Sequence, residues 1–180
     1  INYLSLSGIL SIPGQPDTPP SRPGIPMVDL ASGMYAAIAV MAALRKRDLD
    51  GAGECIDVSM FDAMISWMSV RAGQILVYGE ETENEHLSAL NNIYETKDGK
   101  KISLGILEQN FWRNFCEAIR REDLLKDPRF SAPSERRTHM AELVKIIRGI
   151  ISDRTLEEWE RTLDWREVPY APVYSIKEAL

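Results

Sequence analysis

The stretch Val28-Asp29-Leu30-Ala31-Ser32-Gly33-Met34-Tyr35-Ala36-Ala37 places one ionisable side chain at the start of an apolar segment rich in small residues. The segment is apolar on most faces and ends in basic residues, which the C-terminal end of a helix favours. We therefore predict a helix from Leu30 to about Arg47. The turn Asp50-Gly51-Ala52-Gly53 ends it, and alternation over Glu54–Val58 predicts a short strand, so this region is expected to form part of an α/β layer.

Asp29 permits two interpretations that are compatible with each other. Aspartate is a preferred N-cap, because its carboxylate accepts hydrogen bonds from free N–H groups of the first helical turn. The same place suits a catalytic carboxylate, since the helix dipole and the free amides stabilise the anion. The small residues Ala31, Ser32 and Gly33 are expected to leave room for a ligand beside it.

Further along the chain, capping and turn signals predict alternating elements. Ser59 with Asp62 predicts the start of a long buried helix that reaches about Tyr78. A polar stretch follows, and then Asp98-Gly99 between two strand-like runs predicts a hairpin. The remaining expected elements are helices over 109–119 and 135–151, helices capped by Thr155 with Glu158 and by Ser175 with Glu178, and an extended Pro-containing segment over 168–173.

Composition is ordinary for a globular protein, with 44% hydrophobic and 27% charged residues. The net charge of −6 argues against nucleic acid or an anionic membrane as the main partner. No apolar run approaches the roughly 20 residues needed to span a bilayer. The use of only two cysteines, in apolar-patterned segments, predicts a cytoplasmic protein. Cys55 and Cys116 are expected to be reduced and buried, and His86 and His139 have no metal-ligand spacing, so no metal is expected.

The chain opens at Ile1 without a signal peptide and stops at Leu180 inside a newly capped helix, so we expect an internal piece of a longer protein. Residues 1–80 are predicted to be part of a large α/β domain that carries Asp29. Residues 81–92 are the predicted linker. Residues 93–180 are predicted to form a small α+β domain and the start of a return linker.

Landmarks along nearly the whole chain resemble the family III CoA-transferases, also called the CaiB/BaiF family, which includes the 2-methylacyl-CoA racemases. The resemblance implies a Rossmann-like large domain, a small domain and an interlocked homodimer, with an acyl-CoA thioester as substrate and no further cofactor. The landmarks are the Asp29 segment, the stretch Ile56 to Met60 with Asp62, the hairpin Tyr94 to Gly99, the stretch Gly105 to Cys116, and the turn Val168 to Val173.

Two chemistries are implied by this resemblance. In the transferases, the residue matching Asp29 attacks an acyl-CoA thioester, which gives a mixed anhydride and free CoA thiolate, and CoA then passes to a second acid. In the racemases, the matching aspartate and a histidine act as two bases across the α-carbon of the acyl group, while nearby donors stabilise the enolate.

Local features divide between the two branches. Residues 1–8 are similar to the racemase segment that directly follows the catalytic histidine, and Tyr3 lies in it. Glu108 matches a racemase active-site glutamate, although a glutamate beside the first turn of a helix is also a dipole-favoured, solvated residue. Against this, Ala31-Ser32-Gly33 looks more like the transferases. Because residues 1–8 and Glu108 both match the racemases, we place racemase slightly ahead of transferase.

The resemblance and the residues together name the expected site. Asp29 and Glu108 are the expected catalytic residues, and Tyr3, Gly33 and Met34 are the expected substrate-binding residues. A hypothesis of another class remains open, in which these residues form only a dimerisation and lid portion that is inactive on its own.

Overall fold

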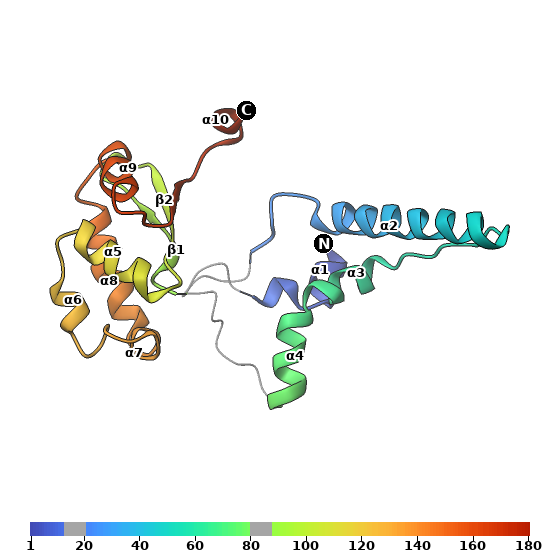
Figure 1. Cartoon of the computed structure of the whole chain (residues 1–180), viewed down its shortest axis with the longest axis horizontal. Coiled ribbons are helices and arrows are strands. Elements are labelled where there is room, and N and C mark those ends of the chain that lie inside the picture. Colours follow the sequence, from blue (N-terminus) through green and yellow to red (C-terminus); the bar gives the residue numbers. More distant parts are fainter. Residues whose placement is uncertain (13–20, 80–87) are drawn as a thin grey trace. The chain divides into compact units, whose positions relative to one another are not determined.

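The computed structural model describes residues 1–12, 21–79 and 88–180 (Figure 1). His86 and residues 13–20 of the proline-rich loop over 11–26 therefore lie outside the described residues. The chain divides into two compact units, Ile1–Glu83 (unit 1) and Asn84–Leu180 (unit 2). The boundary falls within residues 81–92, the predicted linker, but the end of that range belongs to unit 2: Ala89 and Leu90 are buried in its core, and Asn91 begins a strand. Helices and an antiparallel sheet together give the mixed α/β character that the sequence predicts.

The regular elements in the described part of unit 1 are all helices, and irregular segments connect them. The predicted helix that carries Asp29 is present and is longer than expected at both ends. It ends where Gly51 adopts φ 76°, a left-handed conformation that glycine tolerates, and donates its N–H to the Arg47 carbonyl oxygen at 2.7 Å. The elements are α1 (Asn2–Leu6), the 3₁₀ helix η1 (Ile9–Ser11), α2 (Met27–Asp50), α3 (Met60–Trp67) and α4 (Ser69–Tyr78).

Four predictions for unit 1 are wrong. They are a strand over 54–58, a buried Cys55, and a helix after Ser59 that is both continuous and buried, since Leu76, Val77 and Tyr78 are exposed. Glu54–Val58 forms no strand and is largely exposed, because a strand needs a hydrogen-bonded neighbour and the described part of unit 1 contains none. Cys55, predicted to be buried, is exposed for the same reason. The predicted continuous helix after Ser59 is interrupted at Met68, whose N–H bonds to Ile65 in a tighter turn.

The core of unit 1 is small. Three helices contribute to it, and α1 and α2 both pack against α3. Ser59 caps α3 as predicted, since its hydroxyl accepts the Asp62 N–H at 3.1 Å. The buried residues of this core are Leu4, Val28, Ala31, Ala63 and Met64.

Unit 2 is built on an antiparallel sheet in the order β1-β2-β3, formed by Asn91–Glu95, Lys101–Gly105 and Tyr170–Pro172. The predicted hairpin is confirmed, with Tyr94 opposite Ile102 and Gly99 at φ 73° in the turn. Asp98 in the same turn accepts bonds from the Thr96 hydroxyl at 2.6 Å and the Leu156 N–H at 3.1 Å. The turn is thereby tied to the start of a helix far along the chain.

Helices pack against this sheet and enclose a larger core. Both capping boxes, at Thr155 and at Ser175, are confirmed. The helix predicted over 135–151 is instead two helices separated at His139, and a short helix that was not predicted follows Glu122. The helices are α5 (Gln109–Ala118), α6 (Asp123–Lys126), α7 (Pro133–Thr138), α8 (Met140–Ile151), α9 (Leu156–Asp164) and α10 (Ile176–Ala179).

Cys116 lies in the core of unit 2, as predicted. Burial raises the pKa of its thiol to about 12, so it stays protonated and acts as a small apolar side chain. Trp159 crosses the same core and donates its indole N–H to the Ile151 carbonyl oxygen at 2.8 Å. Unit 2 therefore has a well-packed core.

Candidate functional site

Asp29 lies in the first turn of α2, not at its N-cap. The N-cap is Pro26, and the helix begins with the Leu30 N–H bonding to the Pro26 carbonyl oxygen at 3.1 Å. The capping interpretation of Asp29 is therefore wrong. The helix begins earlier than expected because proline, with φ fixed near −65°, suits the start of a helix.

Packing of the first turn presents Asp29 to solvent. Val28 and Ala31 point into the small core of unit 1, where Leu4 and Met64 meet them. Residues between them on the helix necessarily face outward, and Asp29 is exposed. No described residue forms an ion pair or hydrogen bond with its carboxylate. The carboxylate is thus open to solvent, in the first turn of a 24-residue helix.

Gly33 leaves the surface beside Asp29 unoccupied. The two residues are four apart on α2 and share a face one turn apart. Apart from its chain neighbours and the local helix backbone, a Cβ added at Gly33 would have no heavy atom within 4 Å, so an alanine there would project into open space. Met34 lies next to it and is 65% exposed. The expected room beside Asp29 exists on this face.

Ala31 and Ser32 do not contribute to that room, contrary to expectation. Both are buried, because they lie on the side of α2 that faces the core. The Ser32 hydroxyl oxygen is buried without a hydrogen-bond partner. Helical rotation decides this outcome, since neighbouring residues of a helix point in directions about 100° apart.

Tyr3 belongs to the same unit as Asp29. It lies in α1 next to Leu4, which packs in the core that holds Val28 and Ala31. Its side chain is partly exposed, and no described hydrogen bond joins it to Asp29. The structure thus places Tyr3 and Asp29 on helices that share a core, while a common ligand remains a prediction.

Glu108 is the N-cap residue of α5. Its backbone is extended and its carbonyl oxygen accepts the Trp112 N–H at 3.1 Å, while its carboxylate is exposed and makes no capping bond. This is the dipole-favoured position that its sequence context also indicates. Glu108 lies in unit 2 and Asp29 in unit 1, so their sharing of one site remains a prediction.

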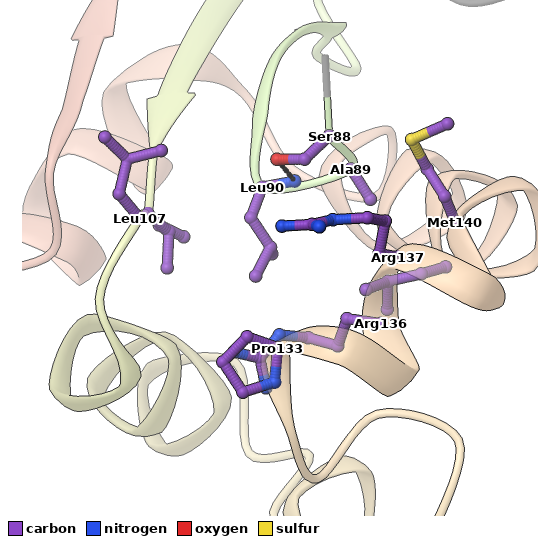
Figure 2. A pocket seen from close by; sticks show the side chains of 10 residues that line it. Ser88, Ala89, Leu90, Leu107, Pro133, Arg136, Arg137 and Met140 are labelled. Carbon is purple, nitrogen blue, oxygen red and sulfur yellow. Dashed lines mark hydrogen bonds between the residues drawn. The ribbon is translucent and has the colours of Figure 1, made fainter. Parts of the chain in front are cut away.

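A cavity in unit 2 was not anticipated from the sequence. It has a volume of about 110 Å³, and Leu90, Leu107, Pro133, Arg136, Arg137 and Met140 are among its lining residues (Figure 2). Arg136 is only 6% exposed. Two consecutive arginines on a short helix predict a solvated face. Only the packing of α7 against its neighbours shows that Arg136 is buried.

No group of three or more His, Cys, Asp or Glu side chains within residues 1–12, 21–79 and 88–180 is placed to hold a metal ion.

One helix, α2, is long and apolar enough to cross a membrane by length and composition alone. This corrects the expectation that no apolar run approaches that length. Core helices of soluble proteins pass the same test, so α2 is only a weak indication of a membrane.

Comparisons with known proteins agree on one family. The model of CoA-transferase family III matches residues 1–180. The succinyl-CoA–D-citramalate CoA-transferase of Chloroflexus aurantiacus is 29% identical over 98% of this chain and 45% of its own length. The (R)-2-hydroxy-4-methylpentanoate CoA-transferase of Clostridioides difficile is 30% identical over 99% of this chain and 45% of its own length.

Solved structures support the same fold. A CaiB/BaiF family protein from Brucella suis superposes with a TM-score of 0.81 at 22% identity, covering 98% of this chain and 48% of that structure. This chain therefore spans about half the length of the relatives that it matches.

Proposed function

We propose that this chain, which belongs to CoA-transferase family III, carries the catalytic carboxylate of an enzyme that moves CoA between carboxylic acids, and that Asp29 is this carboxylate. One observation carries the proposal: within a family match over the whole chain, the acid that the family resemblance singles out is exposed at the first turn of a long helix. Both named relatives described above are CoA-transferases.

In the proposed reaction the Asp29 carboxylate oxygen attacks the carbonyl carbon of an acyl-CoA thioester. The carbon–sulfur bond breaks, CoA leaves as a thiolate, and an aspartyl-acyl anhydride remains. The incoming acid attacks the acyl carbonyl of that anhydride, which frees Asp29 and leaves a new anhydride of the two acids. The thiolate then attacks the carbonyl derived from the incoming acid, so the new thioester forms and the first acid departs.

Features of α2 suit this chemistry. A nucleophilic carboxylate must be ionised, and the N-terminal end of the helix favours the anion. Gly33 keeps the adjacent surface free of side-chain atoms, so a thioester can approach. We propose that Met34 and Tyr3 contact the acyl group.

Racemisation of a 2-methylacyl-CoA is the second candidate. The sequence slightly favours it, through the segment that carries Tyr3 and through Glu108. It requires a partner base, which the resemblance places just before Ile1. The names of the relatives favour transfer instead, so we rank CoA transfer first. In either case we propose acyl-CoA as substrate, no further cofactor, an interlocked homodimer and a cytoplasmic location.

A third possibility is that the 180 residues act only as a dimer-forming and lid-forming portion. It predicts no acyl-CoA turnover by this chain by itself, while the complete enzyme remains active.

One experiment separates the two reactions. The complete enzyme is incubated with a 2-methylacyl-CoA in deuterated water, with and without succinate as acceptor acid. Formation of succinyl-CoA that depends on succinate, without deuterium at the α-carbon, supports transfer. Deuterium incorporation without any acceptor acid supports racemisation and would overturn the first proposal. The same incubation with succinyl-CoA and glutarate tests transfer when the branched acyl group is not accepted.

A further inference from the structure

The cavity in unit 2 contains a buried cation. Arg136 extends along the cavity toward Pro133, and Arg137 extends toward Leu90 (Figure 2). Burying a charged group is costly unless the charge is paired, so the surroundings of the Arg136 guanidinium decide what this cavity can hold.

The partners of Arg136 are all uncharged. Its Nη1 donates to the Phe130 carbonyl oxygen at 2.8 Å, and its Nη2 donates to the Gln109 side-chain oxygen at 2.8 Å. The guanidinium also lies over the Trp112 ring, 5.2 Å from the ring centroid. No described carboxylate forms an ion pair with it, and burial lowers its pKa. Three of its five N–H donors have no described acceptor.

The other residues that line the cavity determine which kind of anion fits it best. Leu90, Leu107 and Met140 supply apolar walls, while Arg137, which is itself engaged in an interaction within the chain, adds a second guanidinium. A planar carboxylate matches the fork of a guanidinium, and a short aliphatic chain matches the apolar walls. A phosphate or sulfate would place hydrated oxygens against those walls. The volume of about 110 Å³ is on the scale of a few-carbon molecule.

From this geometry we propose that the unit 2 cavity binds a small aliphatic monocarboxylate, with the carboxylate on Arg136 and the hydrocarbon chain against Leu90, Leu107 and Met140. The site uses residues of unit 2 alone. It stands whether or not Asp29 carries out the reaction proposed above.

The test is a calorimetric titration of the intact protein with butyrate, supported by line broadening of the butyrate resonances. We expect saturable binding that tightens about fourfold per methylene from acetate through propionate to butyrate, as apolar burial predicts. The neutral analogue 1-butanol and the doubly charged sulfate should bind at least tenfold more weakly than butyrate, on the scale of a lost charge-assisted hydrogen bond.

Variants locate the site. Arg136→Gln should weaken butyrate binding by about 10-fold or more, whereas Arg113→Gln, the same change at an exposed position of α5, should leave it unaltered. Circular dichroism establishes whether each variant is folded. If Arg136→Gln does not fold, the chain-length series on the unmodified protein decides the question.

Three results would each overturn the proposal: no saturable butyrate binding, equal responses to butyrate, acetate and sulfate, or unchanged butyrate binding in a folded Arg136→Gln protein.

Discussion

Helices α2 and α8 show how differently the two units use apolar residues. In α8, Leu143, Ile147 and Ile151 follow one another at four-residue spacing and are fully buried. In the much longer α2, only Val28, Ala31 and Ser32 are buried, all near its start. Unit 2 accordingly has 19 buried residues in its described core cluster, and unit 1 has five. An apolar sequence forms a helix in both units, but its side chains are buried only where other elements of the same unit pack against the helix.

The two units also differ in their proposed roles. Unit 1 carries the proposed nucleophile on a lightly packed helix, while unit 2 supplies the larger core and the cavity of Arg136. Mutation of the proposed nucleophile in unit 1 should therefore lower turnover at little cost in stability, whereas core mutations in unit 2 should mainly lower the free energy of unfolding. The following experiments test this division, in order of decreasing expected effect.

The largest effect is expected from Asp29→Asn in the complete enzyme. Removal of the nucleophilic or basic carboxylate should lower turnover on the order of 10²–10⁴-fold. Its stability should change by less than about 1 kcal/mol, because the residue is exposed and makes no described contact. Acyl-CoA kinetics and urea unfolding measure both quantities.

Asp62→Asn is the matched control for this experiment. Asp62 is exposed and occupies the corresponding third position of α3, so it has the same relation to a helix dipole. Its substitution should leave turnover within about twofold, since it lacks a catalytic role. Equal losses in the two variants would mean that the dipole environment, and not nucleophilic chemistry, explains the effect of Asp29→Asn.

The second experiment compares one substitution in the two units of the 180-residue chain. Ile147 is 0% exposed and Ile38, on α2, is 56% exposed. Ile147→Ala should lower the free energy of unfolding by about 2–5 kcal/mol through lost burial and a cavity. Ile38→Ala should cost less than about 1 kcal/mol. Unfolding followed by tryptophan fluorescence checks both, and similar costs would remove the proposed contrast in packing.

The third experiment concerns the exposed face of α2. Its large apolar side chains include Leu30, Met34, Ile38, Met41 and Leu44. Each forgoes roughly 1.5–3 kcal/mol when left in water, so we expect the 180-residue chain by itself to self-associate and to lack acyl-CoA turnover. Sedimentation should show Ile38→Lys shifting the protein toward monomer. An active, monodisperse monomer of the unmodified chain would contradict this expectation.

The smallest effect concerns the capping box of α9. Thr155→Ala removes the hydroxyl that accepts the Glu158 N–H and should cost about 1 kcal/mol. Hydrogen bonds from the Thr155 backbone and hydroxyl lower the pKa of Glu158 from 4.5. Its stabilising contribution is therefore present above about pH 4.5 and is lost as the pH falls through the folded-state pKa.

Urea unfolding of the unmodified and Thr155→Ala proteins at pH 7 and pH 3 measures this dependence. The difference between the two proteins should be smaller at pH 3, because only the unmodified protein has the bond from the Thr155 hydroxyl to the Glu158 carboxylate, and protonation of the carboxylate weakens it. A cost that is the same at both pH values would show that the box does not act as a reciprocal pair.

Much of unit 2 was predictable from sequence because its signals are local. Asp98-Gly99 defines a turn within four residues, Thr155 and Glu158 form their bonds within one helical turn, and the prolines near Tyr170 exclude a helix by their own geometry. The family resemblance likewise depended on residues in order along the chain. It correctly indicated the family, while the role of Asp29 remains a prediction.

The features that the sequence does not predict depend on contacts between residues far apart in the chain. Glu54–Val58 alternates like a strand, but without a neighbour it stays irregular and leaves Cys55 exposed. Gly33 lies open on the Asp29 face of α2 while Ser32 is buried, because packing against Leu4 and Met64 fixes the rotation of the helix. Arg136 is buried beside Trp112 because α7 packs against α5, a contact between residues more than 20 positions apart. Local chemistry thus determined the elements, and contacts between distant residues determined which side chains face water, a core or a cavity.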